Sequence, residues 1–73
     1  MITVYSKNNC MACKMTKNWL KDNGFSYKET NVDDDLNALT YLIENNLRTM
    51  PVVFKDSDLL ALGFQPDKLK TLL

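Results

Sequence analysis

Residues 2–13 read ITVYSKNNCMAC, which joins a short hydrophobic segment to a polar turn and a Cys-x-x-Cys motif. The β-branched and aromatic side chains of Ile2–Tyr5 predict a mostly buried strand. After the polar turn at residues 7–9, the cysteines Cys10 and Cys13 stand at the start of a helix that we expect to end near Asn23. A strand that leads through a short turn into a helix predicts the beginning of a β-α-β unit.

Strands and helices continue to alternate along the rest of the chain. Gly24 ends the first helix, because glycine tolerates the left-handed conformation that follows a helix end. The further elements that we expect are a strand at Phe25–Val32, a helix from Asp33 to Asn46, strands at Pro51–Phe54 and Leu59–Leu62, and a last helix from Pro66. The order βαβαββα predicts an α/β fold, a mixed four-stranded sheet flanked by helices, as one domain over residues 1–73.

Helical periodicity predicts which side chains the two longer helices bury. In the first helix the apolar face consists of Ala12, Met15, Trp19 and Leu20. In the second helix it consists of Leu36, Leu39, Thr40, Ile43 and Leu47. The acidic run Asp33–Asp35 is expected to cap the free N–H groups at the start of the second helix.

Length and charge exclude several classes of protein. The chain has 73 residues, too few for a second domain, and nine basic residues balance nine acidic ones, so the net charge is +0. Nucleic-acid binders need a basic face, and a membrane-spanning helix needs at least ~18 consecutive apolar residues; the chain has neither. The first residues also lack the hydrophobic core of a signal peptide. We therefore expect a cytoplasmic monomer that binds neither nucleic acid nor membrane.

The two cysteines allow three interpretations. A structural disulfide would close only a very short loop and would be opposed by the reducing cytosol. A structural zinc site needs four ligands, and the chain has two cysteines and no histidine, so a second chain or the carboxylates of Asp33–Asp35 would have to complete it. A redox dithiol needs only Cys-x-x-Cys beside a β-α-β pattern, and this interpretation is favoured.

The position of the motif suggests a role for each cysteine. The unpaired N–H groups at a helix start carry partial positive charge, which favours a thiolate at Cys10. Cys13 lies one turn inside the helix, on the same face, so the two sulfurs can meet. Because thiol–disulfide exchange proceeds through a mixed disulfide, we expect Cys10 to attack the substrate and Cys13 to resolve the adduct.

A second candidate feature is Thr49-Met50-Pro51-Val52 at the start of the third predicted strand. Only about 5–6% of X–Pro bonds are cis, so the local sequence predicts a trans Met50–Pro51 bond. Phe64 follows Gly63 in a loop, where it either contacts partners or packs into the core. Met11, between the cysteines, is expected to be exposed as part of a recognition surface.

These features together resemble the glutaredoxin branch of the thioredoxin superfamily, and within it the NrdH-redoxins. The resemblance rests on Val4-Tyr5-Ser6, Cys10-Met11-Ala12-Cys13, Asn31-Val32-Asp33, Thr49-Met50-Pro51-Val52 and Gly63-Phe64-Gln65-Pro66-Asp67, which follow the family's order and spacing. Members usually read Trp-Ser-Gly-Phe-Arg-Pro near the end, whereas this chain has Ala61-Leu62-Gly63-Phe64-Gln65-Pro66. This departure concerns partner contacts more than the redox chemistry.

The resemblance implies a fold, a chemistry and partners. It implies a thioredoxin/glutaredoxin fold and, against the local expectation, a cis Met50–Pro51 bond beside the dithiol. The implied catalytic residues are Cys10 and Cys13, and the implied partner-binding residues are Met11, Ala12, Thr49, Met50, Pro51, Gly63 and Phe64. The implied activity is that of a thiol–disulfide oxidoreductase without a bound cofactor or metal. It is reduced by thioredoxin reductase at the expense of NADPH, and it donates electrons to the large subunit of a class Ib ribonucleotide reductase.

Two alternatives stay open from the sequence. A glutathione-dependent glutaredoxin would use the same dithiol, although the Gly-Gly-x-Asp glutathione loop of that family is not present as such, because Gly63 is single. A metal- or cluster-bridging module would instead use Cys10 and Cys13 from two chains.

Overall fold

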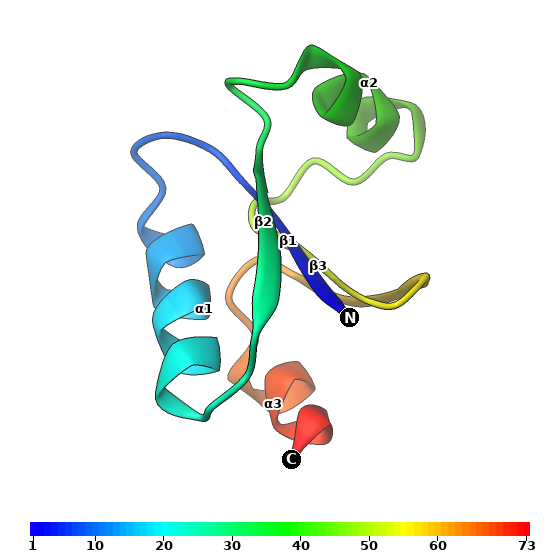
Figure 1. Ribbon diagram of the computed structural model, residues 1–73. Coiled ribbons are helices and arrows are strands. Elements are labelled where there is room, and N and C mark those ends of the chain that lie inside the picture. The colour runs from blue at the N-terminus through cyan, green and yellow to red at the C-terminus, as the bar shows by residue number, and fades with distance from the viewer.

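A single four-stranded mixed sheet organises the protein (Figure 1). The computed structural model describes all of residues 1–73. Its elements are β1 (Ile2–Ser6), α1 (Met11–Asp22), β2 (Tyr27–Asn31), α2 (Leu36–Glu44), β3 (Val52–Lys55), β4 (Asp58–Leu62), α3 (Pro66–Leu69) and the 3₁₀ turn η1 (Lys70–Leu72). The strands lie in the order β2-β1-β3-β4, which confirms the predicted βαβαββα topology.

β1 is paired on both sides. It runs parallel to β2, with Ser6 opposite Asn31, and antiparallel to β3, with Tyr5 opposite Val52. β3 and β4 form the expected antiparallel hairpin. The turn between them contains no glycine; Asp56 adopts the left-handed conformation there, with φ 54°, which aspartate tolerates better than most residues.

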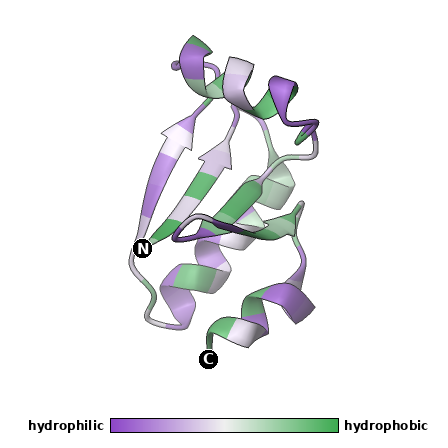
Figure 2. Cartoon of the chain, turned by 90° about the vertical axis from the view of Figure 1, so that its right-hand side faces the viewer, coloured by the Kyte–Doolittle hydropathy of each residue, from purple (hydrophilic) through white to green (hydrophobic).

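The two faces of the sheet carry separate hydrophobic clusters, and hydrophobic residues gather along the middle of the molecule in Figure 2. The larger cluster lies under α1 and α3 and consists of Ile2, Val4, Leu20, Val53, Ala61 and Leu69. The smaller cluster lies under α2 and consists of Val32, Leu42 and Val52. Trp19 packs against the larger cluster and stacks on Phe25, with the ring centroids 6.1 Å apart, as expected of a core residue.

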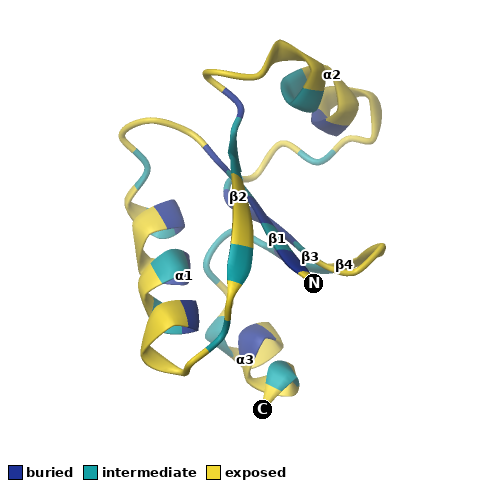
Figure 3. Ribbon diagram, viewed as in Figure 1, coloured by how far each residue is buried: buried dark blue, intermediate teal, exposed yellow.

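The buried stripe of α1 matches the predicted face at Leu20 and in part at Ala12 and Trp19, but not at Met15. Cys13, Thr16 and Leu20 face the sheet, whereas Met15 is 44% exposed, and Figure 3 shows the helix buried only along its inner side. The prediction was wrong for Met15 and omitted Cys13 and Thr16, because it followed hydrophobicity alone. Thr16 can be fully buried because its hydroxyl donates to the carbonyl of Ala12 at 2.9 Å, so no polar atom is left unpaired.

α2 also departs from its predicted face. Leu42 is its one fully buried residue, whereas Leu36 and Ile43 are 73% and 45% exposed, and Thr40 is exposed as well. The helix covers only one end of its sheet face and packs through Ala38, Leu39 and Leu42. So short a contact does not bury a full amphipathic stripe.

The predicted ends of the helices agree with the structure more closely than their predicted buried faces do. Gly24 and Asn46 adopt positive φ angles of 77° and 58° just beyond α1 and α2, and Pro66 opens α3. Within the acidic run, only Asp35 caps α2, by accepting from the N–H of Ala38 at 3.1 Å. No helix of the chain has the length and apolar character needed to cross a bilayer.

The Asp35 cap gives a stability prediction. We expect Asp35→Ala to lower the free energy of unfolding by about 1 kcal/mol, because a helix N–H loses its side-chain acceptor. Urea unfolding followed by circular dichroism measures the change. The matched control is Asp34→Ala, since Asp34 is exposed and its side chain makes no hydrogen bond. An equal loss in both variants would contradict the assignment of Asp35 as the cap.

Candidate functional site

The two cysteines lie at the beginning of α1 and differ in exposure. Cys10 is the N-cap residue, with an extended φ of −117°, and it is half-buried. Cys13 is only 2% exposed. The two form a disulfide with their Cα atoms 5.2 Å apart, and the N–H of Cys13 donates to Sγ of Cys10 at 3.1 Å. A helix-start N–H thus points at the more accessible sulfur, an arrangement that favours negative charge there.

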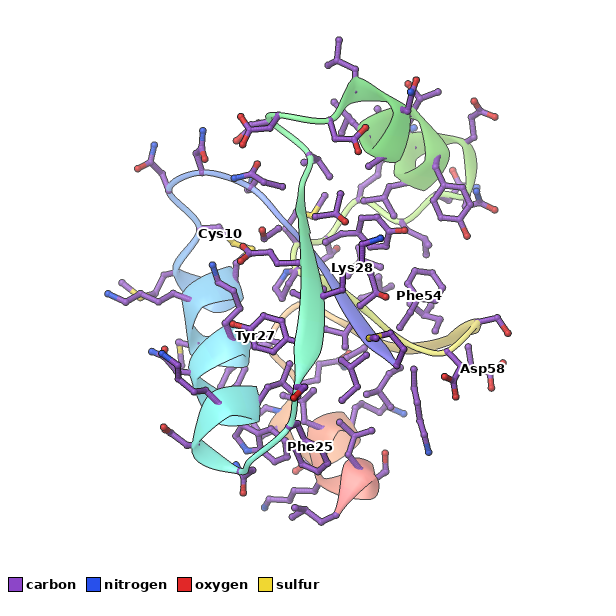
Figure 4. All side chains as sticks on the ribbon, viewed as in Figure 1. Cys10, Phe25, Tyr27, Lys28, Phe54 and Asp58 are labelled. Carbon is purple, nitrogen blue, oxygen red and sulfur yellow. A yellow bond between two sulfur atoms is a disulfide. The ribbon has the colours of Figure 1, made fainter.

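Of the two residues between the cysteines, Met11 is exposed, as predicted. Met11, the first residue of α1, is 69% exposed and lies beside the accessible sulfur in the chain. Ala12 is half-buried. Figure 4 shows the disulfide at the end of α1, well away from Phe25 at the opposite end of that helix.

The loop that delivers Cys10 is tied to the end of β2. Asn9 adopts the left-handed conformation, with φ 54°, directly before Cys10. The N–H of Asn8 donates to the Asp33 carboxylate at 2.7 Å, and the Asn31 side-chain amide donates to the side-chain oxygen of Asn8 at 2.9 Å. Sequence analysis missed this network. The available signal was that Asn31 ends a strand parallel to β1 and Asp33 follows it by two residues, so both lie at the sheet edge from which the Cys10 loop departs.

The start of α1 and the loop before it form one wall of the site. The segment before β3 forms the other wall. The Met50–Pro51 bond is cis, so the local expectation of a trans bond was wrong and the one implied by the resemblance is confirmed. Because Tyr5 pairs with Val52, this bond lies at the same sheet edge as the loop that follows β1. The N–H of Gly63 donates to the carbonyl of Pro51 at 2.7 Å, which joins the end of β4 to the same edge.

The backbone conformation and the close packing at position 63 favour glycine. Its φ of 77° lies in the left-handed region, and a Cβ placed there would meet Cγ2 of Thr49 at 3.4 Å. The structure therefore brings Thr49, Pro51 and Gly63 together, with Thr49 exposed and Pro51 buried. Phe64 is half-buried and packs against the larger core cluster, so part of its ring serves packing.

A polar cluster lies on the other side of the cysteines. The Glu29 carboxylate accepts from the Ser6 hydroxyl at 2.7 Å and forms a salt bridge with Nζ of Lys17 at 2.8 Å. The hydrogen bond from Lys17 and then that from Ser6 lower the pKa of Glu29 below its ordinary value. Nothing in the sequence indicated that these three side chains form a cluster, although Ser6 belongs to one of the stretches that carry the resemblance. Glu29 and Ser6 lie on adjacent strands, and Lys17 is on α1, four residues after Cys13.

A Cys-x-x-Cys disulfide at the start of a helix, with a cis-proline at the head of the neighbouring strand, defines a redox protein of the thioredoxin/glutaredoxin fold. No group of three or more metal-ligating side chains converges anywhere in the chain.

Comparison with known proteins agrees with this class. The family model that matches is Glutaredoxin, over residues 2–60. The chain is 44% identical to the glutaredoxin-like protein NrdH of Lactococcus lactis subsp. cremoris, with 99% of both chains covered. It is 37% identical to the Escherichia coli NrdH protein, over 97% of this chain and 86% of that one. The solved structure of NrdH-redoxin from Escherichia coli superposes with a TM-score of 0.92 at 33% identity, over 99% of this chain and 93% of that one. The chain belongs to the glutaredoxin family, among its NrdH-redoxins.

The Glu29 cluster gives a pH-dependent prediction. Because the folded-state pKa of Glu29 is lowered, its contribution to stability is full above the unfolded-state pKa and is lost as pH falls through the folded value. The Glu29 side chain is 36% exposed, so solvent screening limits the effect. We expect Glu29→Gln to lower the free energy of unfolding by about 0.5–1 kcal/mol at neutral pH.

Urea unfolding at neutral and at acidic pH measures this effect. The difference between Glu29→Gln and the native chain should shrink towards zero in acid. The control is Asp58→Asn, since Asp58 is exposed at the start of β4 and forms no salt bridge. A Glu29→Gln deficit that stays constant across the pH range would contradict the pairing.

Proposed function

We propose that this chain is a dithiol–disulfide oxidoreductase that carries electrons from thioredoxin reductase to the large subunit of a class Ib ribonucleotide reductase. The observation that carries the proposal is the unequal exposure of a bonded cysteine pair: Cys10 is half-buried at the helix start and Cys13 is 2% exposed. Attack on a protein disulfide needs an accessible sulfur, and resolution needs a second one held within reach. In this proposal the protein acts as a cytoplasmic monomer with no bound cofactor.

Each cysteine has a defined step in the proposed reaction. The Cys10 thiolate attacks one sulfur of the substrate disulfide, forms a mixed disulfide and releases one substrate thiolate, which takes up a proton. The Cys13 thiol loses its proton and its sulfur attacks Sγ of Cys10. The Cys10–Cys13 disulfide forms and the second substrate thiol leaves. Two electrons and two protons pass to the substrate, and NADPH restores the dithiol through the reductase.

The elements around the disulfide support binding of a protein substrate. Thr49 and Met11 are exposed and Met50 is half-buried, so residues at the helix start and before β3 are accessible to a partner chain. Met11 suits this use because methionine adapts to irregular surfaces. Ala12, Pro51, Gly63 and Phe64 complete the proposed contact surface.

Two observations favour thioredoxin reductase over glutathione as the electron source. The Escherichia coli NrdH-redoxin, which resembles this chain over nearly its whole length, is described as having a thioredoxin-like activity profile. The turn after β4 also holds the single glycine Gly63, where glutathione-dependent members carry a Gly-Gly-x-Asp loop. Glutathione dependence is the second candidate function, because the same dithiol and fold serve it.

NADPH consumption with a disulfide substrate tests the electron source. One arm supplies thioredoxin reductase, and the other supplies glutathione with glutathione reductase. We expect turnover in the first arm only, and we expect Cys10→Ser to abolish it, since the attacking sulfur is removed. Turnover only in the glutathione arm would overturn the proposed electron source.

NADPH and thioredoxin reductase, with ribonucleotide reductase in place of the small disulfide, test the proposed electron acceptor. We expect deoxyribonucleotide to form only when this chain is present to carry electrons from the reductase. If the chain reduces a small disulfide and leaves the ribonucleotide reductase inactive, the proposed target is wrong.

A further inference from the structure

A hollow of about 660 Å³ opens directly beside the disulfide. It lies between the loop after β1, the first turns of α1 and the end of β2, and its lining includes both Cys10 and Cys13. The residues before β3 and after β4, which form the other wall of the site, do not line it. A substrate chain bonded to Cys10 therefore has a second surface available, on the side away from Pro51. We call this hollow the lysine groove.

The lysine groove carries a positive charge although the chain as a whole is neutral. Its charged lining consists of Lys7, Lys14, Lys17 and Glu29. Lys17 and Glu29 neutralise each other in a salt bridge, and the only other salt bridge of the chain joins the N-terminus to Asp56. Lys7 and Lys14 are therefore unpaired, and both are exposed.

Nothing acidic within the groove compensates these two charges. The first turn of α1 contains no acidic side chain. Glu29, the one acidic residue in the lining, is offset by Lys17, and the Asp33 carboxylate, which accepts from the backbone N–H of Asn8, does not line the groove. Two lysines without an acidic partner thus line the same hollow as the disulfide, where they favour an approaching anion.

We propose that the lysine groove binds acidic side chains that flank the disulfide of the protein substrate. This inference rests on the proposed function, because the ligand must carry a disulfide that reaches Cys10. Groups of opposite charge beside the reacting sulfurs speed encounter and fix the register of the substrate chain. The substrate class is therefore a disulfide-bearing peptide segment with Asp or Glu next to its cysteines.

Three synthetic peptides with the same internal disulfide test this proposal. Their flanking residues are glutamate, glutamine or lysine. The rate constant for reduction by the reduced protein is measured from acid-quenched samples by mass spectrometry, at low and at high ionic strength. At low ionic strength we expect the glutamate peptide to react about five- to tenfold faster than the glutamine peptide, and the lysine peptide to react more slowly than either. High salt should bring the ratio close to one.

Matched variants locate the effect. The double variant Lys7→Gln/Lys14→Gln should lose most of the glutamate-to-glutamine rate ratio. The control, Lys68→Gln/Lys70→Gln, removes the same charge from α3 and η1, outside the groove, and should keep the ratio. Because the readout is a ratio of two substrates on one protein, a change in the intrinsic reactivity of Cys10 cancels.

The outcomes separate the two proposals. If the glutamine peptide is not reduced at all, the proposed oxidoreductase function fails. If all three peptides are reduced at equal rates, the oxidoreductase function stands and the acidic-substrate proposal is overturned. A dependence on Lys7 and Lys14 that appears for glutathione disulfide but not for the glutamate peptide would also overturn it, by making the groove a glutathione site.

Discussion

The double pairing of β1 is the constraint on which the site depends. Its carboxyl end lies beside the end of the parallel strand β2 and beside the start of the antiparallel strand β3. Three chain segments that are distant in sequence therefore meet at one sheet edge: the loop to Cys10, the Asn31–Asp33 turn and the Met50–Pro51 segment. The hydrogen bond from Gly63 to Pro51 adds the end of β4.

At this edge the start of α1 sets the difference between the two cysteines. As N-cap residue, Cys10 stays outside the helix and half-exposed, whereas Cys13 turns inward on the face that carries Thr16 and Leu20. The same helix start directs the N–H of Cys13 to the sulfur of Cys10. One structural feature thus separates an accessible sulfur from a protected one while keeping them within bonding distance.

The two sides of the disulfide also differ in the residues that they present to a substrate. On one side lie Thr49, the cis Met50–Pro51 bond and Gly63, of which Thr49 is exposed and Met50 is half-buried. On the other side lies the lysine groove, in which Glu29 neutralises Lys17 and leaves Lys7 and Lys14 free. In our account a substrate chain is held by the segment around Met50 and Pro51 and is selected by the lysine groove.

The sequence predicted the order of elements, the helix ends and the cysteine pair, because these depend on local signals such as Gly24, Asn46 and Pro66. It predicted the helix faces only in part, since Leu20 and Leu39 contact the core as expected. Met15, Leu36 and Ile43 are exposed because each helix contacts only part of a small sheet, so hydrophobic periodicity overstates what is buried. The network joining Asn8 to Asn31 and Asp33 could not be predicted from composition, because polar residues of these types fill most turns. The cis bond was predicted from the family resemblance and not from its local sequence.

The most direct test of the account is to trap the mixed disulfide. The reduced Cys13→Ser and Cys10→Ser variants are each incubated with a dimer of two peptide chains joined by one intermolecular disulfide, and the intact mass of the protein is measured. We expect Cys13→Ser to gain the mass of one peptide chain, since Cys10 can attack and no sulfur resolves the adduct, and Cys10→Ser to gain none, since Cys13 is buried. An adduct on Cys10→Ser, or equal adducts on both variants, would contradict the assignment of the accessible and the resolving cysteine.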